Sequence, residues 1–138
     1  MAFFWGKNRT KEDIERGKKL EEIIAYLKQI LNLLDGFDDV TTKEKFKQKI
    51  LDVHNEVSDI MDKINNSLLI VNTGDFLKQN YHLRLNDWIN NIPPRIKSLE
   101  TYLNSDFYNA KDILDRVEPI KTIINGLIKQ LEAALKSI

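Results

Sequence analysis

Four stretches of the sequence carry apolar residues at alternating steps of three and four, and turn signals separate them. This spacing puts the apolar side chains on one face of an α-helix, as in helices that pack nearly parallel in a coiled-coil manner. The first two stripes are Leu20, Ile24, Leu27, Leu31 and Leu34, then Phe46, Ile50, Val53, Val57, Ile60, Ile64, Leu68 and Val71. The other two are Leu77, Tyr81, Leu85, Trp88, Ile92, Ile96, Leu99 and Leu103, then Phe107, Ala110, Leu114, Val117, Ile120, Ile124, Leu127, Leu131, Leu135 and Ile138. The pattern predicts an all-α fold, a four-helix up-down-up-down bundle of long amphipathic helices.

Capping signals indicate where these helices begin and end. Thr10 precedes two acidic residues and is expected to cap the first helix, and Gly36 is expected to end it in a left-handed conformation. Thr41-Thr42-Lys43-Glu44 is typical of a capping box, with Thr41 as the cap of the second helix. Asn72-Thr73-Gly74 predicts its end, and Asp75 is expected to cap the third helix.

Prolines interrupt the last two stripes. Pro93-Pro94 falls inside the third stripe and Pro119 inside the fourth, so we expect kinks at both places. A kinked continuous rod and two shorter helices both fit the third stretch. Trp88 is in phase with its stripe, which predicts a core position for its ring.

Composition limits the kind of protein this chain can be. Its 138 residues suit one domain, which we place at residues 10–138, and 42% are hydrophobic. Twenty-one basic and 21 acidic residues give a formal net charge of zero. A nucleic-acid partner is not expected, because phosphate binding normally needs a basic excess.

Catalytic and metal-binding signals are weak. The chain has no Cys, and neither His54 nor His82 has an acidic residue three positions before it, as helical metal sites commonly require. We therefore expect no enzyme activity, metal or cofactor. The acidic row Asp52, Glu56, Asp59 and Asp62 is predicted to be a solvated helix face. Lys78, Arg84, Arg95 and Lys97 form a basic set in the third stretch.

The N-terminal segment, residues 1–9, has the most unusual composition. Phe3, Phe4 and Trp5 are consecutive aromatic residues, and Lys7 and Arg9 follow them. Such a segment can fold back on its own bundle, enter a groove of a protein partner or insert into a membrane interface, where aromatic rings meet the headgroups and cations meet anionic lipid. All three interpretations remain open, and these five residues are the predicted binding site.

Function follows from these observations only as an expectation. The leading hypothesis is a non-enzymatic helical-bundle interaction module, meaning an adaptor, a scaffold subunit or a neutralising partner of another protein. Self-association into a homo-oligomer is also expected, because long apolar seams often pair. The alternative is a peripheral membrane protein anchored by its Phe-Phe-Trp segment. A cytoplasmic location is expected, at the membrane surface in the second case, because no apolar stretch approaches the ~18 residues of a membrane span.

A family resemblance covers about a third of the chain. The run Trp88, Pro93-Pro94, Leu103, Phe107, Ala110-Lys111, Leu114 and Val117 resembles a repeat of the spectrin-like EzrA septation-ring proteins. In those proteins a Trp, a Leu-Pro pair and Phe-x-x-Ala-Lys precede a long amphipathic helix. The Trp-to-Pro spacing is shorter here, and no residue role is carried across.

Overall fold

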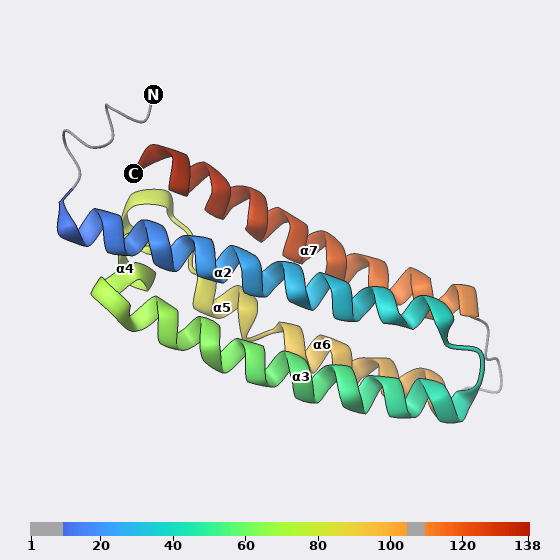
Figure 1. Ribbon diagram of the computed structural model, residues 1–138. Helices are drawn as coiled ribbons and strands as arrows, with labels where there is room; N and C mark the ends of the chain where they lie inside the picture. The colour runs from blue at the N-terminus through green and yellow to red at the C-terminus, as the bar shows by residue number, and fades with distance from the viewer. Residues whose placement is uncertain (1–9, 105–109) are drawn as a thin grey trace.

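The computed structural model describes residues 10–104 and 110–138, and every regular element in those ranges is helical (Figure 1). The long helices are α2 (Lys11–Asp35), α3 (Lys43–Leu69) and α7 (Ala110–Ser137), and the short ones are α4 (Thr73–Tyr81), α5 (Leu85–Ile89) and α6 (Ile92–Lys97). Three 3₁₀ turns join them: η1 (Gly36–Asp39), η2 (Ile70–Asn72) and η3 (Ser98–Asn104). The predicted all-α class is confirmed.

The helices lie side by side in one bundle. In Figure 1, α2 and α3 run in opposite directions, α4 to α6 lead back along α3, and α7 returns beside α2. Helix α2 packs against both α3 and α7, and α6 packs against α3 and α7. These contacts are consistent with an up-down-up-down bundle whose third member is made of short pieces.

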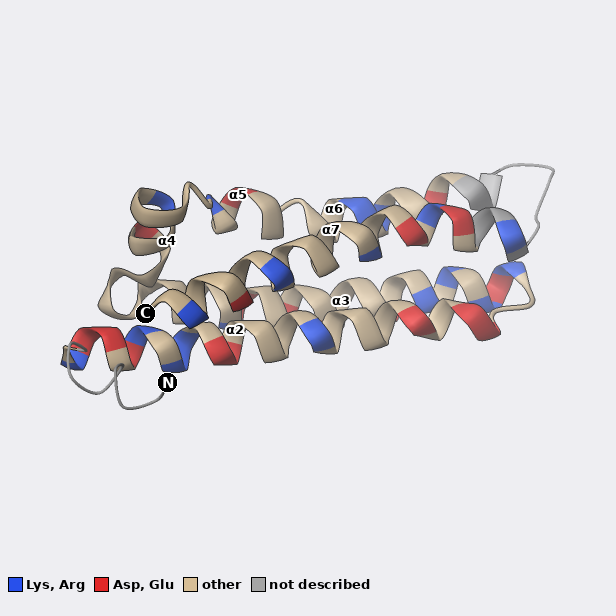
Figure 2. Cartoon of the chain, turned by 90° about the horizontal axis from the view of Figure 1, so that it is seen from above, with Lys and Arg blue, Asp and Glu red and all other residues tan. Residues whose placement is uncertain are grey.

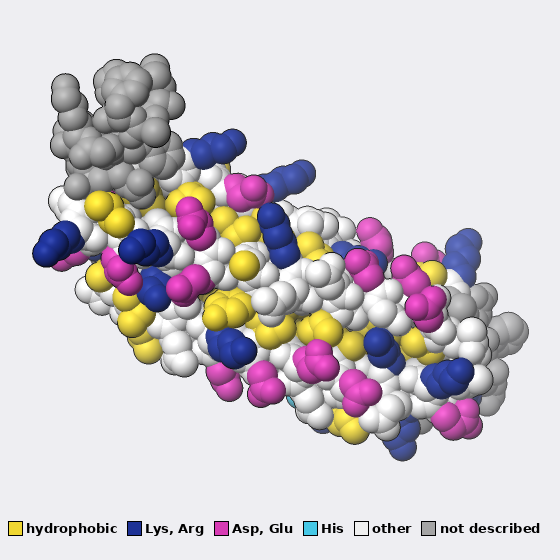
Figure 3. All heavy atoms as spheres, viewed as in Figure 1, with side chains coloured by type: hydrophobic (Ala, Val, Ile, Leu, Met, Phe, Trp, Pro, Cys, Tyr) yellow, Lys and Arg dark blue, Asp and Glu magenta, His cyan; other side chains and the backbone are white. Residues whose placement is uncertain are grey.

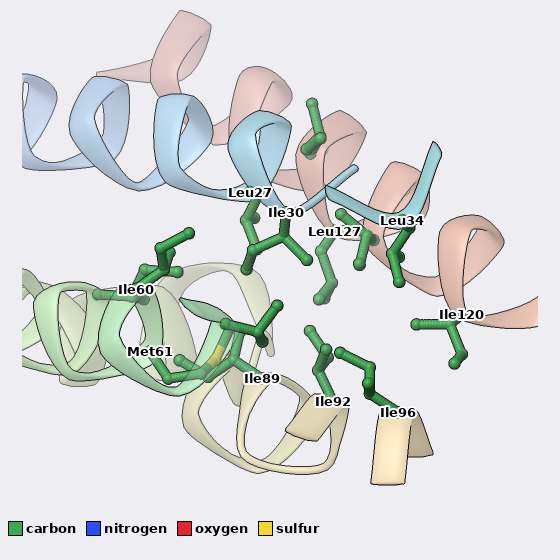
Figure 4. Packing of buried hydrophobic residues seen from close by; sticks show 14 of the residues in the cluster. Leu27, Ile30, Leu34, Ile60, Met61, Ile89, Ile92, Ile96, Ile120 and Leu127 are labelled. Atoms are coloured by element: carbon green, nitrogen blue, oxygen red, sulfur yellow. The ribbon is translucent and has the colours of Figure 1, made fainter. Parts of the chain in front are cut away.

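The core is continuous along the bundle axis. Figure 4 shows side chains from α2, α3, α5, α6 and α7 pointing toward one another, among them Leu27, Met61, Ile89, Ile96 and Leu127. The stripe of α2 is the most completely buried, because Leu20, Ile23, Leu27, Ile30 and Leu34 are all 0% exposed. Burying one such side chain contributes roughly 1.5–3 kcal/mol, so the shared interior is the main source of stability.

The structure confirms the predicted cap at Thr10 and differs from the predictions at the turn between α2 and α3. Thr10 caps α2 as expected, with the Asp13 amide donating to Thr10 Oγ1 over 3.0 Å and the Thr10 amide donating to the Asp13 carboxylate. The cap of α3 is Thr42 and not Thr41, because Thr42 Oγ1 accepts from the Lys45 amide. The sequence predicts a left-handed Gly36, but this residue is right-handed with φ −63°. The chain continues there into the 3₁₀ turn η1.

A rod kinked at Pro93-Pro94 is one of the two forms expected for the third member, and the structure does not have it. The third member breaks first at His82, which is left-handed with φ 53°, and again between α5 and α6. Pro93 lies in the first turn of α6, where a missing amide donor costs no helical hydrogen bond. The prolines therefore start a helix. Pro119 lies inside α7, on its exposed side, and the helix extends from Ala110 to Ser137 on either side of it.

The break at His82 changes which side of the chain faces the core. Leu85 and Ile89 are 2% and 0% exposed, whereas Trp88 is 49% exposed. The predicted core position of Trp88 is therefore wrong. The spacing of the stripe continues through the sequence, but the left-handed residue rotates the next helix about its axis.

This orientation of α5 predicts unequal losses of stability for substitutions at two neighbouring residues. Ile89→Ala should lower the free energy of unfolding by about 3 kcal/mol, because it leaves a cavity in the core. Trp88→Ala should lower it by no more than about 1 kcal/mol, because half of that ring already faces water. Urea denaturation followed by circular dichroism measures both. A larger loss for Trp88→Ala than for Ile89→Ala would contradict the orientation of α5.

Helix α3 ends in a backbone conformation that its residues rarely adopt. The predicted end at Asn72-Thr73-Gly74 is wrong, since α3 stops at Leu69, and Val71 and Asn72 have φ of 45° and 54°. A β-branched residue is strained in this left-handed region. The Val71 carbonyl accepts from Arg16 Nε over 3.1 Å. Arg16 also binds Asp13 and lies over the Phe76 ring, so it ties η2 to α2 and α4.

Relief of this strain is measurable. Val71→Gly should raise the free energy of unfolding by about 0.5–1 kcal/mol, because glycine adopts a positive φ without a steric cost. Ile70→Gly is the matched control: Ile70 has φ −69°, so glycine there brings only its entropic cost and should destabilise the protein. Thermal unfolding of the two variants beside the parent chain separates the effects. Equal destabilisation by both would contradict the left-handed Val71.

An ion pair joins α7 to the C-terminal end of α2. Lys121 Nζ lies 2.7 Å from the Asp35 carboxylate. The hydrogen bond to Asp35 raises the pKa of Lys121, and partial burial offsets some of that increase. The lysine therefore stays charged through the ordinary pH range and links α7 to the end of α2.

Candidate functional site

The most distinctive surface lies where α5 meets α7, and the turn before α5 creates it. The His82 and Leu83 amides both donate to the Leu77 carbonyl, the Leu83 bond being 3.2 Å long. The bond from Leu83 spans six positions and closes the end of α4 around left-handed His82, and Leu83, only 5% exposed, lies in the core. Histidine is among the residues that tolerate the left-handed position. The chain then re-enters a helix with Trp88 facing outward.

A groove about 430 Å³ in volume runs between Trp88 and α7. We call it the Trp88 groove, and its lining residues are His82, Leu83, Trp88, Thr122, Ile123, Gly126, Leu127 and Gln130. Leu83 and Leu127 are buried, Ile123 is half-buried, and the outer residues are exposed. A Cβ added to Gly126 would meet nothing within 4 Å, so the groove is open above the α7 backbone.

Charge is scarce around this groove. Its lining contains no Lys, Arg, Asp or Glu, although such residues make up 30% of the chain. Elsewhere acidic and basic residues are intermixed along α2, α3 and α7 (Figure 2). An exposed tryptophan beside an uncharged groove is typical of a residue that anchors a protein contact, since aromatic anchors in desolvated pockets carry most interface energy.

A second apolar surface lies at the end of the bundle where α2 begins and α3 ends. Ile14, Leu69 and Ile70 are 44%, 75% and 42% exposed. We call these three residues the aliphatic tip. The hydrogen bond from Arg16 to the Val71 carbonyl brings the two helix ends together. In Figure 3 hydrophobic side chains reach the surface at this end, among charged ones.

The basic set of the third stretch is exposed but does not form a positive patch. Lys78 and Arg84 line a hollow of about 390 Å³ together with Asp75 and Asp87. Two carboxylates therefore face the same space as the two cations. The acidic row Asp52, Glu56, Asp59 and Asp62 is exposed along α3, as predicted.

The predicted binding residues Phe3, Phe4, Trp5, Lys7 and Arg9 lie outside the described residues. Their proposed contacts stay predictions. Over the ranges 10–104 and 110–138, no group of three His, Cys, Asp or Glu residues is placed to hold a metal ion. Within the same ranges no helix is long and apolar enough to cross a membrane.

Sequence reasoning missed both apolar surfaces. Only one signal was available for the tip: Leu68, Leu69, Ile70 and Val71 are four consecutive apolar residues, and one helix face cannot bury all four. No equivalent signal existed for Trp88. Its exposure depends on the backbone at His82, which the apolar spacing does not report.

Comparison with known proteins assigns no family to this chain. The sequence matches no protein-family model, and neither curated proteins nor solved structures gave a significant match. The resemblance to the EzrA proteins therefore stays a prediction, and the function is argued from the surfaces themselves.

Proposed function

We propose that this chain is a non-enzymatic helical-bundle interaction module, acting as an adaptor, a scaffold subunit or a neutralising partner, and that the Trp88 groove is its binding surface. The observation that supports the proposal is the 49% exposure of Trp88 beside an uncharged groove. Trp88 stays at the surface because Leu85 and Ile89 of the same short helix face the core. Covering the ring and the groove with an apolar partner removes both from water.

The partner's chemistry follows from that lining. Because the groove lacks full charges, long-range attraction contributes little to binding, and shape and apolar area dominate. An amphipathic helix is the element that fits a groove between two helices, since its apolar residues repeat along one side. Thr122 and Gln130 at the α7 edge supply hydrogen-bonding groups for the polar rim.

Site-specific photo-crosslinking tests this proposal. A photoreactive phenylalanine analogue at position 88, in the full chain inside the native cell, should form a discrete adduct with a protein, identified by mass spectrometry. The same analogue at Leu51 is the control, because Leu51 is 51% exposed but lies on α3 away from the groove. Gly126→Arg in the position-88 chain should abolish the adduct, because the side chain enters the open space above Gly126. Equal labelling from positions 88 and 51, or no effect of Gly126→Arg, would contradict the proposal.

A specific observation supports the second candidate function, peripheral membrane association. The aliphatic tip stands at the end of the bundle where residue 10 joins the Phe-Phe-Trp segment. Three exposed aliphatic residues there add to the three aromatic residues of the segment. Neither set makes a strong anchor alone, but insertion of both at one interface adds their apolar areas.

Vesicle flotation measures this alternative. On vesicles of phosphatidylcholine with about 30% phosphatidylserine, the membrane hypothesis predicts that Leu69→Ser with Ile70→Ser lowers the bound fraction several-fold, because about 1 kcal/mol of insertion energy is lost per aliphatic residue. Leu51→Ser, which removes an equally exposed leucine from the middle of α3, should leave binding unchanged. Replacing Phe3, Phe4 and Trp5 by Ser should also reduce flotation. A parent chain that does not float contradicts the membrane function.

A further inference from the structure

We infer that the occupant of the Trp88 groove is a second copy of this chain, whose α7 lies antiparallel to α7 of the first copy across a two-fold axis near Gly126. The inference rests on the proposed function and adds the identity of the partner. Two-fold dimers are the commonest soluble assemblies, and each copy in them contributes the same surface patch. The patch must therefore be compatible with itself in charge and shape.

The outer face of α7 meets the charge condition. The row of residues centred on Gly126 is uncharged over about five turns, and all of its members are exposed: Pro119, Thr122, Gly126, Gln130, Ala133 and Ser137. A surface that meets its own copy brings each charge near an identical charge close to the axis, and this central row has none. The nearest charge is Lys129, which is exposed about 60° round the helix from Gly126. The chain's net charge of zero also means that two copies do not repel each other at long range.

The flank of this face selects the antiparallel direction. Glu118 and Lys136 lie 18 residues apart, about five turns, so they stand on the same side of α7. In a parallel pair this flank of one copy meets the opposite flank of the other, so Glu118 and Lys136 have no charged counterpart there from the same flank; only the antiparallel pair brings the two equivalent flanks together. Lys129 is exposed on the same flank, and in the antiparallel pair it lies about 7.5 Å along the axis from Glu118 of the other copy and about 9 Å from Lys129 of that copy. In an antiparallel pair centred on Gly126, Glu118 of one copy lies within about 3 Å along the axis of Lys136 of the other. Neither side chain forms an ion pair with another residue of the described part.

Gly126 and Trp88 give this patch a shape that fits a second copy of itself. Because Gly126 has no side chain, the two α7 backbones can approach closely at the axis, where nothing stands above its Cβ position. Trp88 lies along the opposite flank from Glu118 and Lys136, on the groove side of α7. The ring of each copy then covers the edge of the partner helix, so the half-exposed indole becomes buried.

A charge-reversal cycle tests the antiparallel arrangement. Sedimentation equilibrium of the purified full chain should show a monomer–dimer equilibrium. Glu118→Lys alone and Lys136→Glu alone should each weaken the dimer roughly tenfold, because two attractive pairs become repulsive. The double variant should restore the parent dissociation constant. The single-variant effects should fade at about 1 M salt, since screening then acts within a few ångströms.

Two further variants test the centre and the groove. Trp88→Ala should weaken the dimer at least tenfold, whereas Leu51→Ala should not, although it removes an equally exposed apolar side chain. Gly126→Arg should abolish dimerisation by placing two cations at the axis, and Leu51→Arg controls for the added charge. A second copy is contradicted by a concentration-independent mass of 16.2 kDa up to about 1 mM. A dimer insensitive to Trp88→Ala and to both single charge reversals contradicts this interface.

The experiments distinguish failure of the second-copy inference from failure of the proposed function. A monomeric chain whose position 88 crosslinks to a different protein in the cell refutes the second copy and supports the interaction module. A monomeric chain with no groove-dependent adduct refutes both.

Discussion

The whole arrangement depends on burial of the apolar stripe of α2. Its five central residues are fully inaccessible to water, and no single neighbouring helix can cover a stripe that wide. Helices α3 and α7 each pack against one side of it, and α6 closes the gap between them. Each helix of the bundle is thus stabilised mainly by its neighbours, since isolated helices of this length are only marginally stable in water.

The third member of the bundle, α4 to α6, is irregular, and both exposed apolar surfaces lie next to it. Three long helices provide regular packing, whereas α4, α5 and α6 meet it in short pieces with turns between them. At the His82 turn, Leu83, Leu85 and Ile89 stay buried and Trp88 cannot join them. Before the Val71 turn, Leu68 is buried whereas Leu69 and Ile70 are exposed. Apolar exposure here is therefore a consequence of how the chain changes direction between helices.

The charge distribution explains why the apolar surfaces dominate any account of binding. Acidic and basic groups balance and are intermixed over the helices, so no face attracts a partner of one sign over a long distance. The lining of the groove between α5 and α7 contains no Lys, Arg, Asp or Glu. In the function that we propose, recognition depends on fit and on desolvation at short range, and the few flanking charges set the direction in which the partner lies.

The sequence by itself determined the helical class, the long helices α2 and α3 and the position of the Thr10 cap. Those features depend on interactions within a few residues: a 3-4 spacing of apolar side chains and hydroxyl groups that cap nearby amides. Only the tertiary structure decided the course of the third member, because it begins after left-handed Val71 and breaks at left-handed His82, and neither residue is a glycine. The Arg16 hydrogen bond to the Val71 carbonyl helps hold that conformation, and it joins residues 55 positions apart. The exposure of Trp88 follows from the break at His82. Apolar periodicity does not report that break, and therefore it predicted a core position for a ring that the folded chain holds at the surface.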